Sequence, residues 1–382
     1  MAIALLVFSV LFVLAFGVFG FLRGGELGFD FVVFHRAGTE FLQGLNPWQA
    51  AIGSGAPFSY PPHIGSLVAV YGLLPYTLAL TIHTALNCGS ILLITYFANR
   101  WFVGVRNWRQ ISLVQGFCLA IVLGNPFNAH SVYEGQWTLI ATALIFLAWH
   151  MLQNNKQVLA GVCLGVATIK PQVALLLVAF LLCRGYFRVL LIGAALALLL
   201  MVPTLMSFGL TETFSAWFAS MKDYALWPVN QPGSVHVVGM EGVCVSLGLI
   251  GTGTFWKCVA LVSAVVLAYY RNEMSPILQI NFLLASMLTF FYGHDTDFVS
   301  MSLLWSYFAL LAFRTMSYIN MAVAATLLLV IVFPQRFIRV FEIDVLYHTR
   351  TFAIAALWVL AYVWEQKLNR INGVERTSDN ES

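Results

Sequence analysis

Residues 138–183, TLIATALIFLAWHMLQNNKQVLAGVCLGVATIKPQVALLLVAFLLC, decide the fold class of this chain. They contain three apolar runs, near 138–152, 157–170 and 171–183, separated by QNNK and by the Lys170-Pro171 step. Each run is shorter than the ~20 residues that a perpendicular membrane helix needs. Runs this apolar and this closely spaced predict helices that pack together inside a lipid bilayer, some of them short or broken.

The composition of the whole chain points to the same class. Of its 382 residues, 60% are hydrophobic and 9% are charged, whereas a soluble domain carries about 25% charged residues. We therefore predict an all-α polytopic membrane protein that forms a single domain over residues 1–382, with about 12 transmembrane helices. The apolar runs lie near 2–22, 76–98, 110–123, 138–152, 157–170, 171–183, 188–208, 252–270, 276–292, 298–313, 317–333 and 351–364.

Charge distribution suggests an orientation for these segments. If the N-terminus is cytoplasmic, the short inner loops are mostly basic, which agrees with the positive-inside rule. The first outer loop then covers about residues 23–75 and contains helices at the membrane interface, and a cytoplasmic tail covers about residues 365–382. The run 64–74 is too short to span, so we expect it to lie on the membrane surface or to dip into it.

This orientation gathers the polar stretches on one side of the membrane. A structural scaffold has no need for such an asymmetry, whereas a functional site on the outer face explains it. The net charge of +3 and the lack of basic runs give no indication of nucleic acid binding. The stretches are GFDFVVFHRAG, FSYPPH, GNPFNAHSVYEGQW, IKPQ, WPVNQPGSVH and GHDTDF.

The first of these stretches places Asp30 at the mouth of the first apolar run. Apolar residues at helical spacing over 31–45 predict an amphipathic interfacial helix with Phe31, Phe34 and Leu45 on its apolar side. Asp30 precedes this helix, where a carboxylate can cap free N–H groups. From spacing alone, Asp30 is either a helix cap or a functional carboxylate.

Two further stretches carry charges next to apolar runs. In VYEGQW, Glu134, Gln136 and Trp137 precede a run; they are either a helix cap with an aromatic anchor or functional groups, because unpaired carboxylates at membrane depth are costly. In IKPQ, Lys170 closes one run and Pro171 opens the next. Lys170 either extends to the membrane surface or meets an anion, and a phosphate suits a lysine.

GHDTDF places His294, Asp295 and Asp297 together at the end of an apolar run. Such residues can bind a metal, but no second cluster supplies further ligands at recognisable spacing. A role in proton transfer or in substrate binding is the better interpretation, and we predict no metal site.

The six cysteines form no CxxC pair and mostly lie in apolar runs, so we interpret them as small buried side chains.

The order of these motifs resembles glycosyltransferase family 87, whose members are polyprenol-phosphate-dependent enzymes of the GT-C superfamily. The resemblance is carried over about residues 124–200 by Gly135-Gln136, Ala160-Gly161, Lys170-Pro171 and the basic turn 184–188. Upstream, FDFVVFHRAGTEFLQGLNPW and FSYPP resemble the first outer loop of that family. YGHDTDF resembles its late His-Asp motif.

The resemblance implies a GT-C-like fold and an inverting transfer of a sugar, with mannose favoured, from a polyprenyl-phosphate donor at the outer face of a bacterial cytoplasmic membrane. Asp30 matches the position of the catalytic base in that superfamily. We expect Lys170 and His294 to bind the donor phosphate. The candidate substrate-binding residues are Glu134, Gln136, Asp295, Tyr60, Trp137 and His35.

The expected partners are the donor, a glycolipid, glycan or protein acceptor, and membrane lipids. No cofactor is indicated, and the need for a divalent cation is left open. The rival class is a transporter or flippase, which often shows two related halves; we find no convincing internal repeat. A non-catalytic scaffold would leave the one-sided clustering unexplained.

Overall fold

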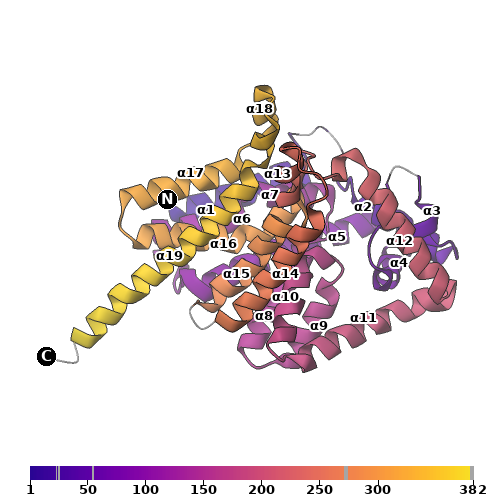
Figure 1. Cartoon of the computed structure of the whole chain (residues 1–382), viewed down its shortest axis with the longest axis horizontal. Coiled ribbons are helices and arrows are strands. Elements are labelled where there is room, and N and C mark those ends of the chain that lie inside the picture. The colour runs from indigo at the N-terminus through magenta and orange to yellow at the C-terminus, as the bar shows by residue number, and fades with distance from the viewer. Residues whose placement is uncertain (23, 25, 54–55, 271–273, 379–382) are drawn as a thin grey trace.

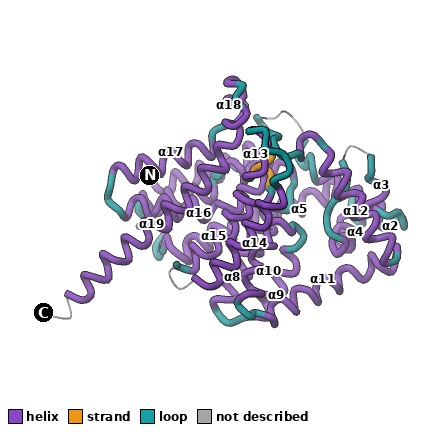
Figure 2. Tube along the Cα trace, viewed as in Figure 1, coloured by secondary structure: helices purple, strands orange, loops and turns teal. Residues whose placement is uncertain are grey.

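The computed structural model describes residues 1–378 except 23, 25, 54–55 and 271–273 (Figure 1). Parts of the predicted first loop and of the predicted tail, namely 23, 25, 54–55 and 379–382, therefore lie outside the described residues. Figure 2 shows that the described chain is almost entirely helical, with one small pair of strands near α13.

The helices follow one another along the chain with short connections. The α-helices are α1 (Ala2–Val13), α2 (Phe31–Leu42), α3 (Pro47–Ala50), α4 (Gly65–Gly72), α5 (Tyr76–Ala98), α6 (Leu113–Leu123), α7 (Pro126–Glu134), α8 (Thr138–Gln153), α9 (Gln157–Ala167), α10 (Pro171–Cys183), α11 (Phe187–Phe208), α12 (Leu210–Leu226), α13 (Met240–Ser246), α14 (Gly253–Tyr270), α15 (Pro276–Ser286), α16 (Ser302–Arg314), α17 (Tyr318–Val332), α18 (Gln335–Ile338) and α19 (Thr349–Ser378). Short segments of 3-10 or π-helix cover Leu14–Val18, Pro62–Ile64, Asn99–Val103, Trp108–Gln110, Pro228–Asn230, Met287–Phe291, Asp295–Met301, Arg339–Phe341 and Asp344–His348.

The all-α class is confirmed, and every predicted apolar run contains a helix. The number of twelve crossings is not confirmed. Within the described residues, five helices are long and apolar enough to cross a membrane: Tyr76–Val103, Phe187–Phe208, Gly253–Tyr270, Asp295–Arg314 and Asp344–Ile371. The other apolar helices are shorter because polar breaks such as QNNK and Lys170-Pro171 end them.

Two hydrophobic clusters organise the molecule. The larger cluster joins the long helices, with α16 buried in its centre. The smaller cluster joins the first loop to α8, with Phe31, Phe34, Trp48 and Trp137 among its buried members. In Figure 1, α11 extends away from the larger group of helices and α12 returns along α3. The smaller cluster therefore gives the first loop a core of its own beside the helix bundle.

The first loop is built on a direct backbone contact between α2 and α4. A Cβ atom on Gly38 would lie 2.1 Å from the Val68 carbonyl oxygen, and one on Gly72 would lie 2.4 Å from the Gly38 carbonyl carbon. Only glycine permits so close an approach. The predicted stripe of α2 is correct for Phe31 and Phe34, which are buried, but the helix ends at Leu42 and Leu45 is exposed.

The run 64–74 folds as a turn of 3-10 helix followed by α4, which is only eight residues long. It packs on α2 and on α11. The close packing of glycines repeats between α9 and α11, where a Cβ atom on Gly161 would lie 2.7 Å from the Val189 carbonyl oxygen. This contact gives a physical reason for glycine in the Ala160-Gly161 motif.

A short sheet that sequence reasoning did not predict joins two distant segments. β1 (Val237–Val238) pairs antiparallel with β2 (Gly293–His294), with Val237 opposite His294 and Val238 opposite Gly293. β2 follows a π-helical turn, Met287–Phe291, which ends the α15 helix before His294. The sheet fixes the backbone of His294 beside the loop that precedes α13.

Candidate active site

The carboxylate of Asp30 binds Gln136, not the helix that it precedes. Gln136 Nε2 donates a hydrogen bond to Asp30 Oδ2, and within the described residues the Asp30 side chain makes no capping hydrogen bond to α2. Asp30 therefore occupies the N-cap position of α2, but its carboxylate does not cap the helix. The Gln136 amide oxygen accepts a 3.4 Å hydrogen bond from the Tyr60 hydroxyl, so three predicted site residues form one chain of hydrogen bonds.

The backbone around Asp30 is held against the end of α7. The Asp30 N–H donates to the Glu134 carbonyl oxygen at 2.8 Å, and the Gly28 N–H donates to the Tyr133 carbonyl oxygen at 2.7 Å. Gly135 follows with φ +72°, and a Cβ atom there would lie 2.7 Å from Phe31 Cβ. Glu134 thus ends α7 and is not a cap of α8, and the left-handed glycine lets the first loop approach closely.

Burial and the nearby Glu134 carboxylate raise the pKa of Asp30 to about 6. The Gln136 hydrogen bond and the charges of Lys170 and His130 act in the opposite direction. A carboxylate with this pKa is mostly ionised at neutral pH yet has a higher proton affinity than an ordinary aspartate. Those are the properties of a general base.

Lys170 is buried and forms an ion pair with Asp297. Lys170 is 4% exposed, and its Nζ lies 2.6 Å from Asp297 Oδ1. It also donates to the Thr138 hydroxyl, which donates to the same Asp297 oxygen at 3.1 Å. The anion that Lys170 meets is thus a carboxylate of its own chain, and the interpretation that Lys170 extends to the membrane surface is wrong.

The junction between α9 and α10 that carries Lys170 also touches the first loop. The Thr168 hydroxyl lies 3.1 Å from His63 Nε2 and donates to the Gly165 carbonyl oxygen at 2.6 Å. His63 follows the Tyr60-Pro61-Pro62 motif, and burial lowers its pKa to about 4. A neutral histidine therefore joins the YPP stretch to the KP stretch.

His294 lies between two tyrosines. Its Nε2 is 3.0 Å from the Tyr224 hydroxyl and 2.8 Å from the Tyr292 hydroxyl, while its backbone N–H donates to Asp297 Oδ2 at 2.9 Å. Burial lowers the pKa of His294, although the Asp297 carboxylate favours the charged form. The imidazole is therefore neutral at pH 7 and acts through hydrogen bonds. Tyr292 also donates to the Asn230 carbonyl oxygen at 3.2 Å, which joins the WPVN stretch to the site.

Asp295 is turned toward a different partner from its neighbours. Its Oδ1 lies 2.7 Å from Arg350 Nη1 at the start of α19, and the Arg350 guanidinium also lies over the rings of Phe127 and Phe298. The side chains of His294, Asp295 and Asp297 thus bind three different groups and do not converge. Within the described chain, no three metal-ligating side chains come together.

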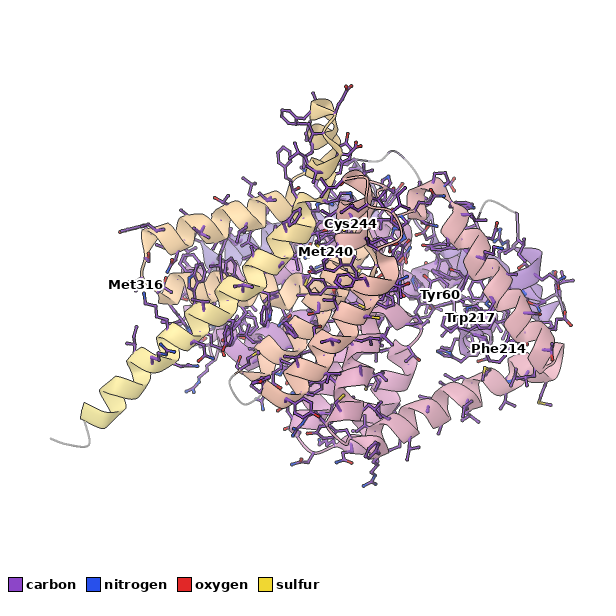
Figure 3. All side chains as sticks on the ribbon, in the orientation of Figure 1. Tyr60, Phe214, Trp217, Met240, Cys244 and Met316 are labelled. Atoms are coloured by element: carbon purple, nitrogen blue, oxygen red, sulfur yellow. The ribbon has the colours of Figure 1, made fainter. Side chains whose placement is uncertain are left out.

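The remaining predicted contact residues are occupied in packing. Trp137 is 6% exposed and packs edge-on against Phe34. His35 donates through Nε2 to the Leu74 carbonyl oxygen at 3.0 Å, since a carbonyl only accepts. Tyr60 packs on Phe34 and, as Figure 3 shows, lies near Trp217 of α12. The indole of Trp217 donates to the Ser59 carbonyl oxygen at 3.1 Å, which ties α12 to this loop.

Sequence reasoning missed several residues that complete the site. Tyr224 lies three residues before the WPVNQPGSVH stretch and Arg350 lies far beyond GHDTDF, and no local pattern marks either residue. His130 lies in the polar stretch GNPFNAHSVYEGQW, and its spacing of four from Glu134 on one helix is the signal that could have identified it. Asp297 and Thr138 were in or beside motifs, but no local pattern pairs them with Lys170. The added residues are His130, Thr138, Tyr224, Tyr292, Asp297 and Arg350.

Comparison with known proteins identifies the family of the chain. The model of glycosyltransferase family 87 matches residues 58–312, which include the Tyr60, Gln136, Lys170 and His294 stretches but begin after Asp30. Searches of curated proteins and of solved structures give no match. The matched region is well over half of the chain. By this match, the chain belongs to glycosyltransferase family 87.

Proposed function

We propose that this chain transfers a sugar from a polyprenyl-phosphate donor to an acceptor hydroxyl, with Asp30 as the general base. The observation that carries the proposal is the hydrogen bond from Gln136 to Asp30. The Asp30 carboxylate is partly buried and is oriented by Gln136, a residue of the region that the family model matches. The carboxylate of an ordinary capping aspartate would instead accept hydrogen bonds from the N–H groups of its own helix. Membership of the family supplies the reaction class, which is glycosyl transfer.

The reaction is a single displacement with inversion. Asp30 takes the proton of the acceptor hydroxyl as its oxygen forms a bond to the anomeric carbon. The bond from that carbon to the phosphate oxygen breaks, and its electron pair leaves with the polyprenyl phosphate. Because Asp30 has a pKa of about 6, it is ionised before the reaction and can release the proton afterwards.

Lys170 and His294 are the proposed ligands of the donor phosphate. Positive charge and hydrogen-bond donors stabilise the charge that develops on a leaving phosphate. The Lys170 charge is already balanced by Asp297, so a phosphate would have to share the lysine with that carboxylate. His294 contributes as a neutral hydrogen-bonding group, together with the hydroxyls of Tyr224 and Tyr292.

Glu134, Gln136 and Tyr60 remain our proposed contacts to sugar hydroxyls, because they surround the Asp30 carboxylate. Asp295, Trp137 and His35 were expected in the same role. Their polar or packing surfaces are engaged by Arg350, Phe34 and the Leu74 carbonyl. We therefore assign these three residues to the wall of the site. Each would have to give up its present contact within the protein before it could bind substrate.

The proposed location is supported by the apolar helices. The five long apolar helices suggest a membrane protein, and a polyprenyl tail would lie among lipid-facing helices. We propose that the site faces the outer side of a bacterial cytoplasmic membrane, with both termini inside and with mannose as the favoured sugar. The acceptor would be a glycolipid, a glycan or a protein.

The test is transfer by purified protein from radiolabelled polyprenyl-phosphate sugars to extracted membrane lipids. We expect product with the unchanged protein and a loss of about 10²–10⁴-fold in rate for Asp30→Asn, the typical contribution of a general base. Near-native turnover by Asp30→Asn would refute the role of Asp30. Movement of a lipid-linked sugar across liposomes without product would favour a transporter instead.

A further inference from the structure

His130 and Glu134 form a close pair beside Asp30, and the proposed reaction assigns no proton transfer to either of them. His130 Nε2 lies 2.5 Å from Glu134 Oε1, one turn along α7. A carboxylate only accepts hydrogen bonds, so Nε2 carries the proton that it shares. The two side chains are 21% and 17% exposed. They are thus partly shielded from solvent. Charges in such a partly buried position act on one another more strongly than charges at an open surface.

The fold fixes this pair relative to Asp30. The Asp30 N–H is bonded to the Glu134 carbonyl oxygen, and Gly135 allows Phe31 to close on the end of α7. Asp30 therefore cannot move away from Glu134 without breaking the junction between α7 and the first loop. The Glu134 and His130 side chains thus stand on the helix end to which the Asp30 backbone is bonded.

The other groups facing Asp30 come from four other segments. Gln136 donates to it from the start of α8, and the ammonium of Lys170 acts from the α9–α10 junction, already paired with Asp297. Tyr60 from the first loop and Tyr224 from α12 are buried hydroxyls whose pKa burial raises.

We propose that His130 and Glu134 are a positioning pair that sets the pH range in which Asp30 holds its negative charge. Neither residue needs to touch the reacting atoms. The proposal deepens the proposed function and rests on it in so far as Asp30 is the base. The electrostatic coupling itself is a property of the protein without substrate.

The two members of the pair act on Asp30 with opposite sign. Glu134 raises the pKa of Asp30 and His130 lowers it. Removing the carboxylate at 134 should therefore extend the ionised range of Asp30 to lower pH. Removing the imidazole at 130 should shift that range to higher pH. A role limited to holding α7 in place would not produce shifts of opposite sign.

The experiment is an infrared pH titration of the full-length purified protein without substrate. The C=O band of protonated Asp30 is identified as the band missing in Asp30→Asn. For Glu134→Gln we expect the midpoint of this band to fall by about one pH unit, as for the loss of a close like charge. For His130→Gln we expect it to rise by a smaller amount, because His130 acts on Asp30 more weakly than Glu134 does. His150→Gln is the matched control, because His150 lies at the far end of α8, about 20 Å from Trp137.

A midpoint that stays in place in both variants, or that moves in the same direction in both, would overturn the proposal. If His130→Gln does not fold, His130→Asn serves in its place. Where transfer is measurable, the acid limb of kcat/KM should move with the infrared midpoint. Shifted midpoints in a protein that transfers no sugar would refute the proposed function and leave the coupling established, so the two failures are distinguishable.

Discussion

The side-chain amide of Gln136 holds the carboxylate of Asp30, a residue 106 positions earlier in the chain. The same amide accepts from Tyr60, so its nitrogen is directed to Asp30 and its oxygen to the tyrosine. Gln136 is thus the group that orients the proposed base. Its position is fixed by Gly135 and by the start of α8.

Replacing Gln136 by Leu should slow transfer without removing the base. A hydrogen bond to a charged group contributes about 1.5–3 kcal/mol, which corresponds to a loss of about 10–150-fold in kcat/KM. The measurement is steady-state transfer with a polyprenyl-phosphate sugar. Tyr60→Phe is the comparison variant, because it keeps the bond from Gln136 to Asp30. It removes the distal 3.4 Å hydrogen bond and one proposed sugar contact, and it should cost a few-fold. An equal loss in both variants would contradict the assignment of Gln136 as the orienting residue.

The rate of transfer should fall as the pH drops through about 6. Asp30 must be ionised to accept a proton, and burial together with Glu134 places its pKa at about 6. We expect a tenfold loss for each pH unit below that value and a plateau above it. The pH dependence of kcat/KM in detergent checks this, with thermal unfolding recorded at each pH as the control. A profile that stays flat down to pH 4.5 would argue against Asp30 as the base.

Asp30→Asn should stabilise the protein at neutral pH. The pKa of Asp30 is raised from 3.8 to about 6, so the folded state binds the proton more tightly than the unfolded state. Ionised Asp30 therefore costs stability above pH 6, and this cost disappears below about pH 4. We expect a gain on the order of 1–3 kcal/mol at pH 7. Thermal unfolding at pH 7 and at pH 4 measures it, and a lower midpoint for the variant at pH 7 would be the contrary result.

Removing only one charge of the Lys170–Asp297 ion pair should lower the stability of the protein strongly. Lys170→Met leaves the Asp297 carboxylate buried without its charge partner, and such losses amount to about 3–5 kcal/mol. The double variant Lys170→Met/Asp297→Asn removes both charges and keeps an acceptor for the His294 N–H, so it should recover most of the stability.

The double variant also separates structure from binding. If Lys170 binds the donor phosphate, the stable double variant should still bind a polyprenyl-phosphate sugar at least tenfold more weakly. Unchanged donor affinity in that variant would limit Lys170 to a structural role. Donor affinity is measured by competition with radiolabelled donor.

Gly38→Ala should separate α2 from α4. Its Cβ atom would lie 2.1 Å from the Val68 carbonyl oxygen, and backbone cannot yield as a side chain does, so a loss of at least about 1–3 kcal/mol is expected. Gly89→Ala is the matched control on α5, because a Cβ atom there meets nothing within 4 Å. Limited proteolysis within residues 31–72 reports the effect, and equal protection of both variants would show that the contact is dispensable.

The helical membrane class was readable from the sequence because it depends on local properties. Apolar runs such as 171–183 form helices wherever they lie, and polar breaks such as Lys170-Pro171 end them. The order of the polar motifs also sufficed to indicate the family. Sequence gave less guidance on helix length, since runs broken by a few polar residues fall short of a full crossing.

Only the tertiary structure decided what the charges do. Asp30 fits a helix cap equally well by spacing, yet long-range packing through Gly38, Gly72 and Gly135 brings it to Gln136. Lys170 meets Asp297 for the same reason, because α10 and the segment before α16 are neighbours in space and not in sequence. A local pattern specifies backbone conformation and amphipathic faces. Which polar groups satisfy one another inside a low-dielectric interior is determined by the packing of helices that are distant along the chain.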